Sequence, residues 1–196
     1  MSKGSQFERE FCKRLSLWWS EMADDGIFWR TSNSGGRATA RGKAKTRYQH
    51  GDVTFTDPSG IPFLDMFTVE LKRGYKDVSV LNLLDKRPQH KMQTLEEFFV
   101  QAITSHEAEG SQTWLLVTRK NQREDVVWFE KSFYKLIKKH LRDVPIILTR
   151  TLLRRKTRAE RRKEKPRNIC GIRLNDFFER IGSQEIRDLV EMLQRN

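Results

Sequence analysis

Residues 50–72 read HGDVTFTDPSGIPFLDMFTVELK, and this stretch decides the fold that we expect. Two runs of strand type, 51–56 and 63–72, flank an Asp-Pro-Ser-Gly turn signal. Because successive side chains of a strand point to opposite faces, Asp52 and Glu70 both fall on the polar faces of their strands. Paired as a hairpin, the two strands would bring these carboxylates close together.

Two neighbouring carboxylates with a lysine beside them suit the hydrolysis of phosphodiesters. Asp52 and Glu70 offer the oxygen ligands that Mg²⁺ prefers, and the backbone carbonyl of Leu71 offers a third. Lys72 lies on the same strand face as Glu70, where it would orient the attacking water or stabilise the transition state. Whether Lys72 is the general base stays open, and a Glu-x-Lys triplet on its own is more often a solvated pair.

The rest of the chain alternates helical and strand patterns. Apolar residues within 6–22 follow one helical face, and 27–30 form a short strand pattern. A longer helix is predicted over 91–109, with Gly110 as its stop. The further predictions are helices at 77–86, 132–141, 175–181 and 184–194, and strands at 114–118, 126–129, 145–149 and 169–174. This order predicts an α/β or α+β fold with a mixed central β-sheet flanked by helices.

The length of 196 residues favours one domain. We expect a core over 1–149, with a basic segment and the last strand and helices over 150–196 packed on the same domain. The tryptophans fall on apolar helix faces or strand runs, so we expect them in the core rather than as base-stacking platforms. They are Trp18, Trp19, Trp29, Trp114 and Trp128.

The charge balance points to an anionic partner. The chain has 38 Lys and Arg against 26 Asp and Glu, a net charge of +12 and a pI near 10.0. That balance fits nucleic acid or an anionic membrane. No apolar run is long enough to span a bilayer, and acidic residues in the first helix argue against a signal peptide. Cys12 and Cys170 lie in no metal-ligand spacing, which suggests reduced thiols in a cytosolic-type compartment.

Two basic segments are candidates for contacts with phosphates. The segment 33–48 has no acidic residue and lies between Glu8 and Asp52 in sequence, so we expect it over the site. The segment 150–167 would be a DNA clamp, an RNA-binding arm or a solvated helix, and we favour a contact with nucleic acid. The candidate phosphate ligands are Arg37, Arg41, Lys43, Lys45, Arg47, Arg154, Arg155 and Lys156.

Taken together, these residues resemble the PD-(D/E)XK nuclease superfamily, which has a restriction-endonuclease-like core. Its pattern is an Asp that opens one strand and (Asp/Glu)-x-Lys on the next, here Gly51-Asp52 and Glu70-Leu71-Lys72. Glycine stands at the position where the name of the superfamily has proline, a common variation. The run GSQFERE at 4–10 resembles the first helix of archaeal-type Holliday-junction resolvases, and RTSNSGG at 30–36 resembles their Ser/Gly loop. The resemblance covers about residues 4–120.

The resemblance implies roles for particular residues. Glu8 would join Asp52 and Glu70 in a metal site, with Mg²⁺ as the cofactor and Mn²⁺ as a substitute. Gln101 would lie near the scissile phosphate, although a solvent-facing helix glutamine is an equally good interpretation. Ser34, in the Ser/Gly loop, would contact DNA. Attack by water would leave a 5′-phosphate and a 3′-hydroxyl.

The implied partner is DNA, branched or duplex, with a homodimer if two strands of a junction are cut together. No membrane and no small-molecule cofactor are expected, and the setting would be cytoplasmic and nucleoid-associated, encoded by a phage or mobile element. Three hypotheses follow: a structure-selective DNA endonuclease, a sequence-specific restriction-type endonuclease, and a non-catalytic basic module that binds nucleic acid. We adopt the first.

Overall fold

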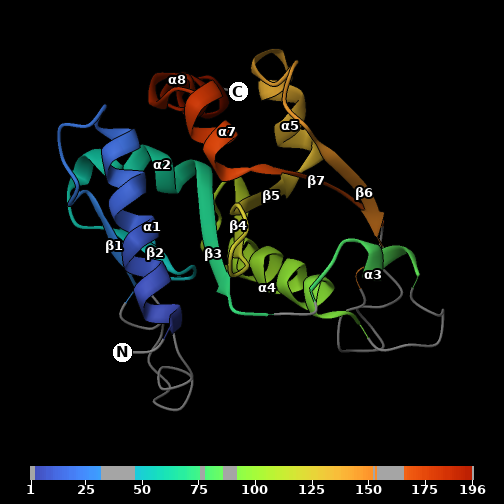
Figure 1. The fold of residues 1–196 in the computed structure, drawn as a ribbon. Coiled ribbons are helices and arrows are strands. Elements are labelled where there is room, and N and C mark those ends of the chain that lie inside the picture. Colours follow the sequence, from blue (N-terminus) through green and yellow to red (C-terminus); the bar gives the residue numbers. More distant parts are fainter. Residues whose placement is uncertain are drawn as a thin grey trace.

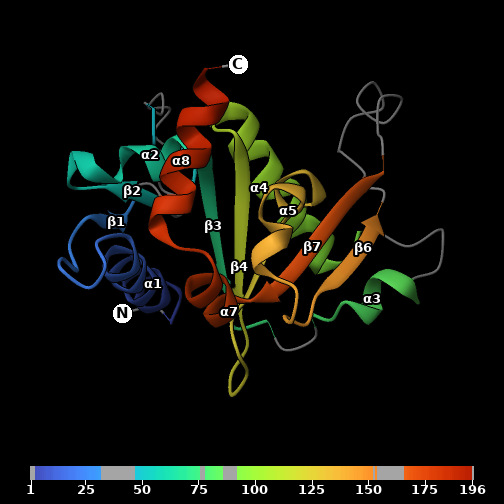
Figure 2. The same cartoon turned by 90° about the horizontal axis from the view of Figure 1, so that it is seen from above.

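A mixed five-stranded β-sheet forms the centre of the computed structural model, which describes residues 3–31, 47–75, 78–85, 92–151, 153 and 166–195. The strands are β3 (Phe67–Arg73), β4 (Thr113–Arg119), β5 (Val126–Glu130), β6 (Ile147–Thr151) and β7 (Arg167–Arg173). They lie in the order β3-β4-β5-β7-β6. β3 and β4 are parallel, and all other neighbours are antiparallel. Figures 1 and 2 show β3 at one edge of the sheet and β6 at the other.

Helices cover both faces of this sheet, because alternate strand residues bury apolar side chains on each side. On one face α4 (Thr94–Glu109) buries Phe99 in a cluster with Trp114 and Leu116 of β4. The other face carries α1 (Lys3–Trp19), α2 (Ile61–Met66), α5 (Lys131–Ile137), α7 (Leu174–Arg180) and α8 (Ser183–Gln194). The predicted mixed sheet flanked by helices is therefore confirmed (Figure 1). Among the described residues, none of these helices has the length and apolar character that a membrane crossing requires.

The segment that precedes β3 does not form the predicted hairpin. Instead, β2 (Val53–Phe55) pairs antiparallel with β1 (Phe28–Arg30) in a separate two-stranded sheet. Between β2 and β3 the chain forms a 3₁₀ turn at Pro58–Gly60 and then α2, each with a proline in its first turn, where proline is tolerated. The first part of the predicted strand 63–72 is thus helical, and the hairpin prediction is wrong.

Helix α1 is built on the predicted apolar face. Of the predicted face, Phe7, Phe11 and Leu15 are buried, and Trp19 is buried in place of Trp18, which is only partly buried. Met22 is 72% exposed, because the helix ends at Trp19 rather than at residue 22. Trp29 contradicts the prediction that every tryptophan lies in the core, because its side chain is 49% exposed. The cause is strand alternation: on β1 the inward position belongs to its neighbour Phe28.

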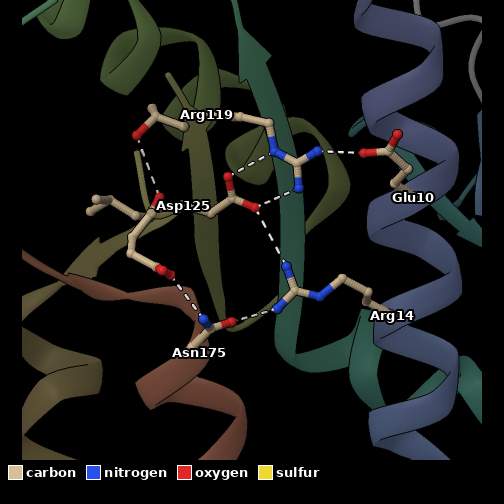
Figure 3. A network of polar contacts seen from close by, with 8 residues as sticks. Glu10, Arg14, Arg119, Asp125 and Asn175 are labelled. Atoms are coloured by element: carbon tan, nitrogen blue, oxygen red, sulfur yellow. Dashed lines mark hydrogen bonds and ion pairs between the residues drawn. The ribbon is translucent and has the colours of Figure 1, made fainter. Parts of the chain in front are cut away.

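A network of ion pairs ties α1 to β4, to the turn that follows β4 and to α7 (Figure 3). The guanidinium of Arg119 donates to both carboxylate oxygens of Asp125, at 2.8 and 2.7 Å, and also pairs with Glu10 of α1. Arg14 of α1 lies 3.5 Å from Asp125 and donates to Asn175 of α7 at 2.8 Å. This network therefore holds α1 in place beside the edge strand β3.

The C-terminal part of the chain contributes to the central sheet. β7 lies between β5 and β6 (Figure 1). The expected boundary between residues 149 and 150 falls inside β6. Phe177 of α7 and Ile186 of α8 belong to the same buried cluster as Phe7 and Val69. The remaining short helices are α3 (Leu81–Leu84) and a 3₁₀ turn at Lys138–His140.

Candidate metal and phosphodiester site

Asp52 is held against the edge strand of the sheet by its backbone and its side chain. Its N–H donates to the carbonyl of Val69 at 2.8 Å, and its Oδ2 accepts the N–H of Leu71, also at 2.8 Å. Directly after β1, the Thr31 N–H donates to the Asp52 carbonyl at 3.0 Å, and the Thr31 hydroxyl donates to the Gly51 carbonyl at 2.9 Å. These bonds place the Asp52 carboxylate beside Glu70 without a hairpin.

Gly51 makes this close approach possible. A Cβ atom at position 51 would lie 2.6 Å from the carbonyl oxygen and 3.1 Å from the nitrogen of Val69. Proline would bring the same Cβ, so the backbone of this chain accounts for glycine at the position that precedes the aspartate. The sequence departure noted above therefore has a local steric cause.

Replacing Gly51 by alanine is expected to lower the free energy of unfolding by about 1–3 kcal/mol, because the new methyl group meets backbone atoms that cannot rotate away. The displacement of Asp52 is expected to slow nucleic-acid cleavage by about 10²-fold. Urea denaturation and initial cleavage rates measure the two effects. Gly4→Ala is the matched control, since a Cβ at Gly4 meets nothing within 4 Å. Unchanged stability and cleavage in Gly51→Ala would contradict this account.

Glu70 is buried, with 2% of its surface exposed, and each of its oxygens accepts a hydrogen bond from α4. The amide of Gln101 donates to Oε2 at 2.8 Å, and the hydroxyl of Ser105 donates to Oε1 at 2.7 Å. Burial, and then the negative charge of Asp52, raise the pKa of Glu70 to about 7. A bound cation would relieve the repulsion between these two carboxylates.

Lys72 lies two residues after Glu70 on β3 and is close to its carboxylate. Its Nζ is 3.3 Å from Oε2 of Glu70 and 5.8 Å from the centre of the Phe98 ring. The side chain is only 15% exposed, so its ammonium is held by a carboxylate on one side and an aromatic face on the other. The structure thus brings together Asp52, Glu70, Leu71, Lys72 and Gln101.

Glu8 forms an ion pair with a residue outside this group. Its carboxylate pairs with Nε of Arg30 at 3.0 Å, and Arg30 also donates to the hydroxyl of Ser5 at 3.1 Å. Burial, and then the charges of Glu8 and Asp52, raise the pKa of Cys12 to about 12, so both carboxylates act on this buried thiol. Among the residues that the structure describes, no three His, Cys, Asp or Glu side chains gather closely enough to hold a metal. The metal role of Glu8 stays a prediction.

The donor atoms of the site fit a hard divalent cation. Asp52 and Glu70 supply carboxylate oxygens, and the Leu71 carbonyl lies between Glu70 and Lys72 on the same strand. This oxygen set suits Mg²⁺, which keeps several waters and uses one or two protein carboxylates. The raised pKa of Glu70 also favours a cation at this site, because a bound cation would offset both the burial of Glu70 and its repulsion by Asp52.

Most of the predicted DNA contacts lie outside the described residues. They are Ser34, Arg37, Arg41, Lys43, Lys45, Arg154, Arg155 and Lys156. Arg47 is described: its guanidinium pairs with Asp65 at 2.7 Å and lies over the ring of Tyr48 at 4.7 Å. The Tyr48 hydroxyl donates to the same Asp65 oxygen at 2.7 Å. The end of the basic segment is thus anchored on α2, and its contact with DNA stays a prediction.

Ser105 is the residue of the site that sequence reasoning missed. It lies one helical turn after Gln101, and residues four apart on a helix share a face. The same spacing that places Gln101 over Glu70 therefore also places Ser105 there. A search for polar residues at this spacing on α4 would have found the pair.

Replacing Gln101 by alanine is expected to lower cleavage activity or metal affinity by about 10–100-fold, because residues that orient a metal ligand have effects of this size. An increase in the Mg²⁺ concentration that gives half-maximal cleavage would distinguish a role in positioning Glu70 from a general loss of structure. Thr104→Ala, at an exposed position of the same helix, is the control. Equal Mg²⁺ titrations for wild type and Gln101→Ala would rule out this role.

The fold and the site define a class of enzyme. A mixed sheet whose edge strand carries Glu-x-Lys, with an Asp bonded to that strand, is the arrangement of a PD-(D/E)XK nuclease. Over residues 1–188 the chain matches the family model described as "Phage putative PDDEXK endonuclease", and the chain belongs to this family. No curated protein and no solved structure matches it significantly. The resemblance to the superfamily is confirmed, whereas the closer resemblance to Holliday-junction resolvases stays a prediction.

Proposed function

We propose that the protein is a Mg²⁺-dependent endonuclease that hydrolyses phosphodiester bonds in DNA and selects its substrate by structure. The observation that supports this most is that Asp52 bonds to the edge strand next to buried Glu70 and acts on its charge, with the Lys72 ammonium 3.3 Å from Glu70. Membership of a nuclease family supports the reaction class. A net charge of +12 supports a polyanionic substrate.

Asp52, Glu70 and the Leu71 carbonyl would hold the metal. When bound, Mg²⁺ would neutralise charge on the scissile phosphate and make water a better nucleophile. Gln101 and Ser105 fix Glu70 by donating one hydrogen bond to each of its oxygens. In the same way, the Leu71 N–H fixes one oxygen of Asp52.

Lys72 would stabilise the negative charge that develops on phosphate oxygens in the transition state. Its ammonium has three donors, and only part of that capacity is used by Glu70. Because the ammonium is largely shielded from water, its interaction with a phosphate is stronger than at an exposed position. This role requires Lys72 to be charged and close to the substrate. Its contacts with the Glu70 carboxylate and the Phe98 ring favour the charged form and fix its position.

The finer parts of the proposal concern the substrate and the assembly. Structure selectivity is proposed because the first helix resembles that of junction resolvases and because the basic segments suit phosphates rather than base edges. A homodimer would cut both strands of a junction together. Mn²⁺ would replace Mg²⁺, and the phage family supports action on DNA inside an infected cell.

The test is a panel of branched, flapped, bulged and linear DNA duplexes, with RNA for comparison, each incubated with and without Mg²⁺. We expect cleavage of the branched or interrupted duplexes in the presence of Mg²⁺, and none by Lys72→Ala. A pure protein that cuts none of them, or a fully active Lys72→Ala, would refute the proposal. A discrete set of fragments from plasmid DNA would favour a sequence-specific endonuclease instead.

A further inference from the structure

A pocket of about 350 Å³ opens beside Lys72, on the α4 face of the sheet. Its walls come from the ends of β3 and β4, from the start of α4 and from the chain after β3. Phe98, Trp128 and Tyr75 line it with aromatic rings, and Val126 and Ile147 add aliphatic surface. The rings of Tyr75 and Phe98 meet edge to face, with centroids 4.6 Å apart. This lining offers flat apolar surface for a flat ligand.

The charged residues at this pocket point to an anionic ligand. Lys72, Arg119, Lys120 and Arg123 line it, against the single carboxylate of Glu124. Arg119 and Lys72 already pair with carboxylates, so the added positive charge comes chiefly from Lys120 and Arg123, in the turn between β4 and β5. An aromatic pocket with cations at its rim is the combination that binds single-stranded nucleic acid.

Lys72 connects the pocket to the proposed catalytic site. Its ammonium contacts Glu70 on one side and lies over the ring of Phe98 on the other. If a phosphate of a DNA strand is bound at Lys72, the base of a neighbouring nucleotide can therefore reach the pocket. The volume lies near the lower end of the range of about 300–1,000 Å³ for small-ligand pockets and is sufficient for one base.

We propose that this pocket binds one unpaired nucleobase of the DNA strand that is being cut. This inference rests on the proposed function and gives it a substrate class: DNA with a base outside the stack near the scissile phosphate. A base already unpaired at a bulge, flap or junction enters without the cost of unstacking, which an intact duplex must meet. The pocket thus provides a physical basis for structure selectivity.

Stacking rather than base-edge recognition would hold the base. The indole N–H of Trp128 already donates to the Thr118 hydroxyl at 3.0 Å, and Ser79 accepts the N–H of Leu81 at 3.2 Å. These polar groups are occupied within the protein, so the interaction depends on the rings. Tyr75 contributes most of the exposed ring surface, because Phe98 is only 7% exposed and Trp128 only 4%. Stacking of this kind tolerates every base, because each base has a π face.

The test measures binding in EDTA, so that no cleavage is needed. The probes are a duplex with a single-nucleotide bulge and the same duplex with an abasic analogue at the bulge, each with a terminal fluorophore for anisotropy. We expect the full-length protein to bind the bulged base about tenfold more tightly than the abasic bulge. Tyr75→Ala is expected to lose this preference and Tyr75→Phe to keep it, since phenylalanine retains the ring.

The controls separate the pocket from the fold and from the catalytic site. Tyr75 is 47% exposed, so its replacement leaves the core intact. Leu148→Ala removes an apolar side chain that is 59% exposed. Leu148 follows the pocket residue Ile147 on β6, so its side chain lies on the opposite face of the sheet. This variant is expected to keep the preference.

Equal affinity of the wild type for the two bulges, or an unchanged preference in Tyr75→Ala, would overturn the pocket proposal even if the protein cuts DNA with Mg²⁺. Conversely, a base preference in a protein that cuts nothing would support the pocket and refute the nuclease function.

Discussion

Replacing Asp52 by asparagine is expected to slow DNA cleavage by about 10³-fold or more while leaving the fold intact. The loss corresponds to several kcal/mol of transition-state stabilisation, which is what a catalytic divalent cation contributes. The fold survives because the asparagine oxygen can still accept the N–H of Leu71, the bond that Asp52 makes at 2.8 Å. Only the charge is lost, and with it one of the two carboxylates that would hold the metal.

The matched control for this variant is Asp57→Asn. Asp57 lies five residues further along and also accepts a backbone N–H, that of Ser59, at 2.8 Å, but it is exposed and away from Glu70. Asparagine caps such a turn as well as aspartate does, so stability and cleavage are expected to be unchanged. Single-turnover cleavage with saturating Mg²⁺ compares the two variants. Comparable rates for Asp52→Asn and Asp57→Asn would remove Asp52 from the site.

Replacing Glu70 by glutamine is expected to abolish cleavage and, in the absence of metal, to stabilise the fold. In the folded protein the pKa of Glu70 is about 7, above its ordinary value of 4.5. A raised folded-state pKa contributes stability below about pH 4.5 and loses it as the pH rises through 7. Glutamine mimics the protonated form, so at pH 8 the variant is expected to gain roughly 2–3 kcal/mol over wild type.

Urea denaturation in EDTA at pH 4.5 and pH 8 measures this effect. The two proteins are expected to be similar at the lower pH and to diverge at the higher one. Mg²⁺ is expected to raise the stability of wild type and to have little effect on Glu70→Gln, because a ligand stabilises only the state that binds it. Glu97→Gln, the same change at an exposed position of α4, is expected to stay within about 0.5 kcal/mol of wild type. A Glu70→Gln protein less stable than wild type at pH 8 would contradict the proposed repulsion.

The centre of the site was predictable from sequence because it depends on short-range rules. Strand alternation alone puts Glu70 and Lys72 on one face, and the structure has them 3.3 Å apart. The closeness of Asp52 to this pair was also predicted, but for the wrong reason. Its carboxylate bonds to the backbone of the edge strand, and no hairpin is involved.

The errors arise where packing decides between two local structures. Phe63, Leu64 and Met66 are all buried, and such a short apolar run is compatible with a strand or a helix. Here it forms α2, since the chain must cross from β2 to the edge of the main sheet. Helical spacing from Gln101 marks Ser105 as a candidate, but its contact with Glu70 depends on how α4 packs on β3, 35 residues away in sequence.

The order of strands across the sheet also bears on how the chain emerges from the ribosome. β6 is synthesised before β7, yet β7 is the strand that joins it to β5. Until Arg167–Arg173 have been synthesised, one edge of β5 is unpaired and β6 has no strand with which to form backbone hydrogen bonds. We therefore expect the sheet to close only after β7 has been synthesised, so that the proposed nuclease core stays incomplete until then.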